Sequence, residues 1–295
     1  MKSFWNRLFP RKRAPEPDAA KTAPLDPETL GKEVLGERHG HITVGSAQSK
    51  GIERTHNEDA LLVFLGTSGG QEAIPDFGLF LVADGMGGHR SGEVASAITA
   101  RTVARSLTSS TLLGLFDNSP SDARVPLQDL MRQSLEEANL AVVERVPGGG
   151  TTLTVALMLG EQITFGHVGD TRAYVITHGS IQPVTRDHSL VERLRELGQL
   201  TRQEAATHPQ RNVLYRAIGQ GANLEVDVFT HPVPADAYLL VCSDGLWGVV
   251  DDNLIGEIVR TAASPQAACE RLVQAANAAG GPDNISAVLV HFPPI

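Results

Sequence analysis

The feature that most constrains the fold of this chain is a set of short, almost wholly apolar segments that meet an aspartate. Apolar runs of five or six residues are typical of buried strands and are short for a helix. Several strands of a common core are therefore expected to carry a carboxylate at one end. The junctions are residues 79–83 before Asp84, 163–168 before Asp170, 238–243 before Asp244, and Asp283 before 285–290.

The rest of the pattern mixes strands and helices. Further strands are expected over 60–65 and 152–159, and apolar residues at helical spacing predict helices over 94–107 and 127–142. A Ser264-Pro265 start predicts a third helix to about residue 276, before Gly280-Gly281. The helices stand in pairs between clusters of strands. This order favours antiparallel sheets with helices packed outside over a doubly wound parallel sheet.

The first 40 residues differ from the remainder. Residues 1–13 hold five Lys and Arg, no acid, and the apolar side chains Phe4, Trp5, Leu8 and Phe9. Residues 14–30 are rich in proline and predict a linker. We expect 1–40 to be a disordered tail, with weak contact of 1–13 to an anionic membrane or a partner as the alternative.

Charge and cysteine content exclude several classes of function. The net charge is −9, and residues 14–295 carry 20 basic against 34 acidic residues, a net −14. A nucleic-acid-binding protein needs a basic footprint, so no nucleic-acid partner is expected. Cys242 and Cys269 cannot form a zinc finger or a disulfide scaffold, and no apolar run of about 20 residues is present. A cytoplasmic protein is expected.

The carboxylates at the strand ends point to metal chemistry. Each Asp alone fits a turn, because Asp-Gly and Asp-Asn are common turn dipeptides. Together on one rim they would repel one another unless a cation neutralised them. Mg²⁺ and Mn²⁺ prefer carboxylate, carbonyl and water ligands, and a glycine after the Asp lets its carbonyl approach an ion.

A charged segment precedes the strand at 60–65. It places Arg54 four residues before Glu58, which Asp59 follows. Arginine is the preferred bidentate partner of a phosphate. The alternative is a surface ion pair between Arg54 and Glu58 at i,i+4 spacing.

Taken in order, these segments resemble the PPM (type 2C) metal-dependent protein phosphatases, bacterial branch. The resemblance implies an α+β fold, a central sandwich of two antiparallel sheets flanked by helices on both sides. It also implies one catalytic domain over 41–292. The matching stretches are 54–59, 82–88, 150–152, 167–172, 185–189, 243–247 and 282–286.

The resemblance also assigns roles to residues. Glu58 and Asp59 match the acidic pair that contacts the metal cluster, directly or through water. Arg54 matches the arginine that binds the substrate phosphate. The metal ligands fall on Asp84, the carbonyl of Gly85, Asp244 and Asp283, with Asp170 at a third, weaker site.

Two further features follow from the resemblance. Some family members have His at the position of Met86, as donor of a proton to the leaving oxygen. Methionine transfers no proton, so the donor is unassigned. The stretch 188–216 resembles a mobile flap that biases substrate choice. His56, His89 and His188 are expected to be structural or to support the site residues from behind.

The function implied is hydrolysis of phosphoserine and phosphothreonine on proteins at a site with two, or as many as three, Mn²⁺ or Mg²⁺ ions. A Ser/Thr protein kinase would be the opposing enzyme. A cysteine-based phosphatase is disfavoured, because Cys242 is expected at the buried end of a strand. The alternatives are a pseudophosphatase that binds phosphoproteins, and nuclease chemistry, which the acidic body opposes.

Overall fold

The computed structural model of the protein describes residues 41–68, 74–87, 90–113 and 125–294. The segment 1–13, the proline-rich linker and His89 lie outside these ranges, so the predictions made for them are not addressed. Within the ranges, no helix combines the length and the apolar character needed to cross a membrane.

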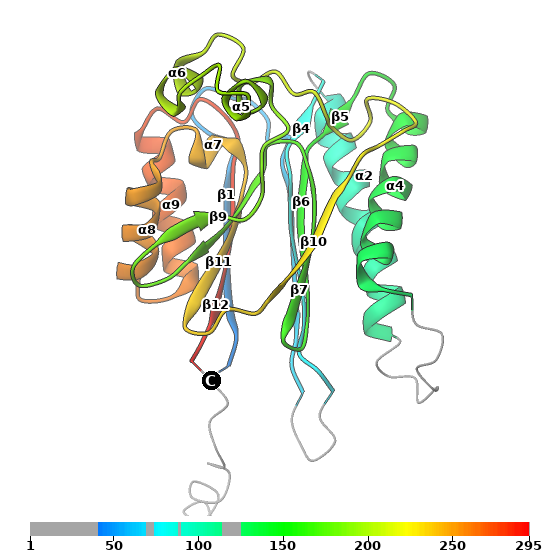
Figure 1. Cartoon of the computed structure of the whole chain (residues 1–295), viewed down its shortest axis with the longest axis vertical. Coiled ribbons are helices and arrows are strands. Elements are labelled where there is room, and N and C mark those ends of the chain that lie inside the picture. The colour runs from blue at the N-terminus through cyan, green and yellow to red at the C-terminus, as the bar shows by residue number, and fades with distance from the viewer. Residues whose placement is uncertain (1–40, 69–73, 88–89, 114–124, 295) are drawn as a thin grey trace, which may run out of the picture. The chain divides into compact units, whose positions relative to one another are not determined.

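Two five-stranded antiparallel sheets form the centre of the domain (Figure 1). The first has the order β1-β12-β11-β8-β9 and the second the order β10-β7-β6-β3-β2. The strands of the first are β1 (Thr43–Ser49), β8 (Arg172–Ile176), β9 (Ile181–Pro183), β11 (Ala237–Cys242) and β12 (Ile285–Phe292). Those of the second are β2 (Ala60–Gly66), β3 (Phe77–Ala83), β6 (Leu153–Leu159), β7 (Gln162–Val168) and β10 (Asp227–Pro232). A small ribbon pairs β4 (Gly85–Met86) with β5 (Gly150–Thr151).

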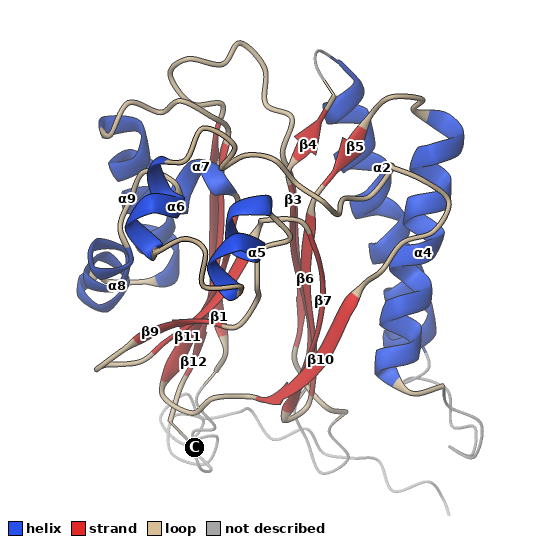
Figure 2. Cartoon of the chain, turned by 45° about the horizontal axis from the view of Figure 1, so that its top comes forward, coloured by secondary structure: helices blue, strands red, loops and turns tan. Residues whose placement is uncertain are grey.

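Helices cover the outer face of each sheet, so the layers run helix, sheet, sheet, helix (Figures 1 and 2). The second sheet is covered by α2 (Arg90–Leu107), continued by the π-helical turn η2 (Thr108–Leu112), and by α4 (Leu127–Arg145). The first is covered by α7 (Asp244–Trp247), α8 (Asp252–Thr261) and α9 (Pro265–Ala278). Two short helices, α5 (Leu190–Glu196) and α6 (Arg202–Thr207), lie between β9 and β10. The predicted fold class is confirmed.

The apolar runs arise because the strands are buried on both faces. All seven residues of β3 are buried. Leu79 and Leu81 pack toward α2 and α4, whereas Phe80 and Val82 pack between the sheets against residues such as Val288. A strand covered on both sides has no polar face and reads as a continuous apolar run.

The strand register brings the aspartates to one edge of the sandwich. Ala83, at the end of β3, pairs with Ala60 at the start of β2, and Leu153 pairs with Val168 at the end of β7. In the other sheet, Cys242 at the end of β11 pairs with Arg172 at the start of β8. The uppermost edge in Figure 1, here called the carboxylate rim, therefore collects five residues. They are Asp59, Asp84, Asp170, Asp244 and Asp283.

Candidate functional site

Asp84 is held by its backbone at the point where β3 ends. Its amide donates to Thr152 Oγ1 at 3.2 Å, and its carbonyl accepts from Thr151 Oγ1 and from Thr152 N, both at 2.8 Å. The next residue, Gly85, lies against the backbone of Glu58 and Gly92, where a Cβ would collide with both carbonyls. Glycine is therefore required for this close approach.

Asp59 is anchored by two serine hydroxyls from the other sheet. Its Oδ2 accepts from Ser243 Oγ at 2.9 Å and from Ser286 Oγ at 2.7 Å. Ser286 points inward from β12, and Ser243 lies between β11 and Asp244. These bonds fix one carboxylate oxygen and join the two sheets at the rim.

Asp283 makes an ion pair with Arg54. The distance from Arg54 Nη2 to Asp283 Oδ2 is 2.6 Å, and Asp283 Oδ1 accepts from Asn284 N at 2.8 Å. Both side chains are partly exposed, at 52% for Arg54 and 32% for Asp283, so the guanidinium lies at the open side of the rim. The ion pair is made across the site and not to Glu58 at i,i+4 spacing.

Glu58 is positioned by its backbone. Its amide donates to Asn284 Oδ1 at 2.8 Å, and its carbonyl accepts from Ser96 Oγ of α2 at 2.6 Å. Asn284 Nδ2 also donates to the carbonyl of His56 at 2.8 Å. A single buried asparagine thus orders the segment that carries Arg54, Glu58 and Asp59.

Asp170 is buried in the loop that crosses from β7 to β8. Its carbonyl accepts from Trp247 Nε1 at 3.0 Å. The indole ring is covered by Arg172, whose guanidinium carbon lies 3.4 Å from the ring centroid. Arg172 also binds Asp187 with two hydrogen bonds, of 2.9 and 2.7 Å. The loop is therefore held by Trp247 of α7, which Arg172 at the start of β8 keeps in place.

Burial and mutual repulsion disturb the acidity of the rim. Burial raises the pKa of Asp59 to about 7 and that of Asp244 to about 6, and neighbouring carboxylates add to both shifts. The pKa values of Asp84 and Asp170 are raised well above the usual range, first by burial and then by the charges around them. Ionised carboxylates at this rim therefore require a compensating positive charge.

Two observations test whether the rim fits divalent cations. Asp59 Oδ1 and Asp244 Oδ1 are buried and have no hydrogen-bond partner among the described residues. Such orphaned acceptors are rare in folded proteins and fit oxygen ligands of a metal. Within the same residues, no three His, Cys, Asp or Glu side chains form a ready-made metal cage. An ion bound by few carboxylates, a carbonyl and water suits the rim, as for Mg²⁺.

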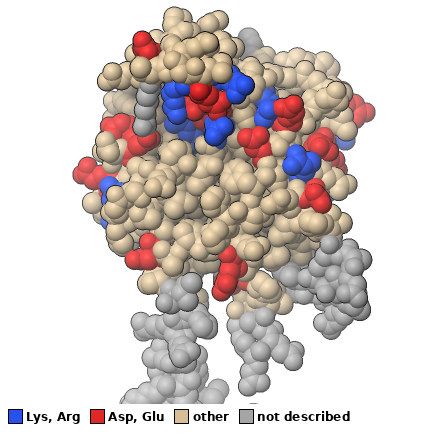
Figure 3. All heavy atoms as spheres, viewed as in Figure 1, with Lys and Arg blue, Asp and Glu red and all other residues tan. Residues whose placement is uncertain are grey.

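The stretch 188–216, here called the flap segment, lies beside the rim and contains α5 and α6. Ser189 caps α5, and Thr201 begins α6 with a capping box. Exposed ion pairs cover the segment, among them Arg193–Glu196 and Arg195–Glu192. Figure 3 shows acidic and basic side chains mixed at the top of this face.

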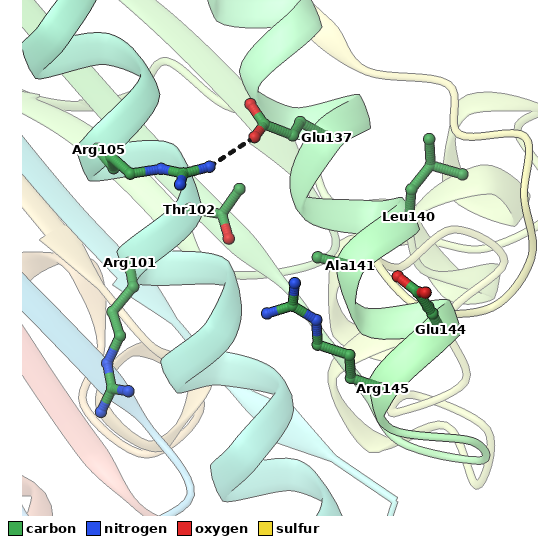
Figure 4. A pocket seen from close by; sticks show the side chains of 8 residues that line it. All are labelled: Arg101, Thr102, Arg105, Glu137, Leu140, Ala141, Glu144 and Arg145. Carbon is green, nitrogen blue, oxygen red and sulfur yellow. Dashed lines mark hydrogen bonds and ion pairs between the residues drawn. The ribbon is translucent and has the colours of Figure 1, made fainter.

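Two surface hollows lie apart from the predicted site residues. One, of about 400 Å³, separates α2 from α4 and is bordered by the Arg105–Glu137 ion pair (Figure 4). The other, of about 680 Å³, lies beside the flap segment next to Tyr215 and Arg216. Neither contains a carboxylate of the rim.

The structure brings together all the site residues predicted from sequence, while their roles remain predictions. Cys242 is buried at the end of β11, and burial raises the pKa of its thiol, so it is unsuited to be a nucleophile. No role of Ser286, Asn284 or Trp247 was predicted from the sequence. Ser286 had a signal, because it is a polar residue inside an apolar run.

Comparison with known proteins identifies the family. The profile of the family described as protein phosphatase 2C matches residues 50–289. The serine/threonine phosphatase Stp of Listeria welshimeri is 34% identical over 242 residues, covering 82% of this chain and 92% of Stp.

Two solved structures agree. The crystal structure of the Mycobacterium tuberculosis serine/threonine phosphatase PstP has a TM-score of 0.71 at 29% identity and covers 85% of this chain and 99% of that one. The PstP catalytic domain in complex with two manganese ions has a TM-score of 0.67 at 29% identity, covering 85% and 97%. The chain therefore belongs to the protein phosphatase 2C family of serine/threonine phosphatases.

Proposed function

We propose that this protein hydrolyses phosphoserine and phosphothreonine on proteins with two divalent metal ions held at the carboxylate rim. The observation that carries the proposal is the pair of buried, unpartnered oxygens on Asp59 and Asp244, set among carboxyls whose pKa values are raised. The fold relative PstP, solved with two manganese ions, supports Mn²⁺ as one candidate. Mg²⁺ is the other.

The ligands proposed are Asp84, the carbonyl of Gly85, Asp244 and Asp283, with Asp170 at a third ion and Glu58 and Asp59 in contact with the metal ions directly or through water. Metal ions bound there would supply Lewis-acid activation of water and neutralise charge on the phosphoryl oxygens. Asp283 can take part although Arg54 and Asn284 already donate to it, because an ionised carboxylate offers about four lone-pair sites.

The chain's own contribution to substrate binding centres on Arg54. Its guanidinium lies at the open side of the rim, where Nη2 donates to Asp283 and Nε donates to the Pro282 carbonyl. The remaining donors can bind a phosphoryl group as a fork. Met86, which pairs with Gly150 in the small ribbon, offers no proton to the leaving oxygen. That proton must come from another group.

Several finer predictions belong to the same proposal. The enzyme would oppose a Ser/Thr protein kinase and would act in the cytoplasm, for which the two cysteines, free and buried, are the available support. Residues 41–292 would form the catalytic domain, with 188–216 as its flap. The acidic body still argues against a nucleic-acid substrate.

The experiment is phosphate release from a phosphothreonine peptide. Turnover is expected with Mn²⁺ or Mg²⁺ and none is expected with EDTA. Asp244→Asn should abolish most activity, whereas Asp236→Asn, at the opposite end of β11, should leave it unchanged. Full activity in EDTA contradicts the metal mechanism. Inactivity with every metal, together with retained phosphopeptide binding, favours the pseudophosphatase.

A further inference from the structure

Both ends of the flap segment meet at the side chain of His188. The residue is 2% exposed and its ring lies between those of His167, at 4.8 Å, and Tyr215, at 5.8 Å. Its position is directly after Asp187, which Arg172 binds. The imidazole therefore stands at the junction between the flap segment and the loop that carries Asp170.

One side of the imidazole holds Gly169. The amide of Gly169 donates to His188 Nδ1 at 3.0 Å, and the amide of His188 donates to the Gly169 carbonyl at 2.7 Å. Gly169 has a φ of 108°, and a Cβ there would collide with the side chain of Thr152. A glycine has many backbone conformations available, so the two bonds select this one. Asp170 is the next residue.

The other side of the imidazole holds β10. Because Nδ1 accepts a hydrogen bond, the neutral ring must carry its hydrogen on Nε2. Nε2 lies 3.2 Å from Asp227 Oδ2 and 3.1 Å from Arg216 Nη1. With its hydrogen on Nε2 the ring donates to Asp227, and Arg216 Nη1 donates to Asp227 Oδ1 at 3.0 Å. The bond from His188 is the largest cause that lowers the pKa of Asp227, to about 2, which keeps it an acceptor.

The backbone of His188 closes the flap segment on itself. Its carbonyl accepts from Tyr215 N at 3.0 Å, and Leu190 N donates to Val213 O at 2.8 Å. Ser189 and Leu214 form an isolated bridge beside these bonds. The start and the end of the flap segment are thus joined at one residue, which also contacts Gly169.

We propose that His188 is a positioning residue that fixes the conformation at Gly169, and with it the direction of the Asp170 side chain, from the base of the flap segment. The consequence for metal binding rests on the proposed function, because it requires Asp170 to be a ligand. The effect of His188 on the backbone of Gly169 does not rest on the proposed function, and it is tested without metal.

Two substitutions separate the two sides of the ring. In His188→Asn the amide oxygen can take the place of Nδ1 and keep the bond from Gly169. In His188→Gln the amide nitrogen can take the place of Nε2 and keep the bond to Asp227, while Gly169 loses its acceptor. Both variants remove the ring, so both lose its packing against His167 and Tyr215.

The readout is amide hydrogen exchange at Gly169 in EDTA, with Val288 in β12 as the reference for global opening. His188→Gln should exchange about tenfold faster at Gly169, since the buried amide there loses its acceptor. His188→Asn should stay close to the unmodified chain. Equal rates in His188→Gln and the unmodified chain, or equal acceleration in both variants, overturns the proposal.

A measurement on the unmodified chain stands even if a variant does not fold. The nitrogen spectrum of the imidazole should show the tautomer with hydrogen on Nε2, and hydrogen on Nδ1 contradicts the proposal.

Trp247 gives a second readout. In a Trp5→Phe background, Trp247 is the only indole and reports on the Asp170 carbonyl that it binds. His188→Gln should shift its emission in EDTA. An absent Mn²⁺ response with these results intact would count against the proposed function alone.

Discussion

The carboxylate rim and the flap segment lie side by side but are built in different ways. The rim residues stand at the ends of strands whose register is set across two sheets, and hydroxyls from the opposite sheet hold Asp59. The flap segment consists of two short helices, each started by a local cap at Ser189 or Thr201. The rim is placed by long-range packing, and the two helices of the flap segment begin with local hydrogen bonds.

The two regions also treat charge differently. In the rim, acidic groups are buried among other acidic groups, which raises the pKa values of Asp84 and Asp170. In the flap segment, charges are paired and exposed, as in Arg193–Glu196. Exposed pairs contribute about 0 to 1 kcal/mol, whereas buried like charges are costly. The carboxylates of the rim therefore lower the stability of the fold, whereas the ion pairs of the flap segment change it little.

The largest expected effect comes from Asp84→Asn. If Asp84 is a central metal ligand, the substitution should lower turnover of a phosphopeptide on the order of a thousandfold, since metal catalysis supplies several kcal/mol. In EDTA the same variant should melt at a higher temperature, because one repelling carboxyl is removed. Asp76→Asn, just before the other end of β3, is the matched control. Unchanged melting in Asp84→Asn would show that the rim is not repulsive.

A smaller effect is expected at His167, the residue before the last of β7. The ring is fully buried between Thr154 Oγ1 and the Arg186 carbonyl, each at 2.9 Å. Burial lowers its pKa to about 4. Between pH 6.5 and 4 the unfolded chain binds this proton and the folded chain does not. The stabilising contribution is complete above pH 6.5 and falls by about 3 kcal/mol toward pH 4.

The matching measurement is urea unfolding in EDTA at pH 7.5 and 4.5. His167→Gln keeps hydrogen-bonding groups but does not titrate, so it should lose this part of the acid sensitivity. His231→Gln, on the exposed part of β10, should behave like the unmodified chain. Parallel pH dependences for all three proteins would contradict the shift at His167.

The residues of the rim were predicted well from the sequence, but several strands and the contacts between the site residues were not. The apolar runs before Asp84 and Asp244 and after Asp283 are strands because burial on both faces demands such runs. The strands β1, β8, β9 and β10 were not predicted, since their burial is mixed and their sequences alternate weakly. A long apolar run identifies a strand even at a sheet edge, as in β2, whereas strands without such a run have a composition that also suits loops.

The contacts within the site were less predictable. The partner of Arg54 is Asp283, 229 positions away, while spacing alone offered Glu58. No rule on neighbouring residues can find a pair that only the packing of two sheets brings together. Ser286 is different, because a hydroxyl inside the apolar run of β12 must find a buried partner. The short helix α7, a single turn after β11, left no periodicity to detect.

A further prediction concerns the support of Asp59. Ser286→Ala removes one of the two donors to its Oδ2 and should weaken Mn²⁺ binding about tenfold, as loss of an outer-shell partner does. Gln48→Ala is the control, because Gln48 donates to the same hydroxyl at 2.8 Å without contacting the carboxylate. Calorimetric titration with Mn²⁺ measures both. Equal losses in the two variants would assign the effect to Ser286 packing and not to Asp59.

The smallest effect is expected in the flap segment, at Thr201→Ala. The hydroxyl accepts from Glu204 N at 3.2 Å, and Glu204 Oε2 accepts from Thr201 N at 2.8 Å. Loss of this cap costs about 1 kcal/mol, so proteolytic cleavage within α6 should accelerate about fivefold. Thr207→Ala, at the other end of the helix, is the control. Because local bonds place α6, the melting temperature and the Mn²⁺ affinity should not change; a fall in either would show that α6 and the rim form one cooperative unit.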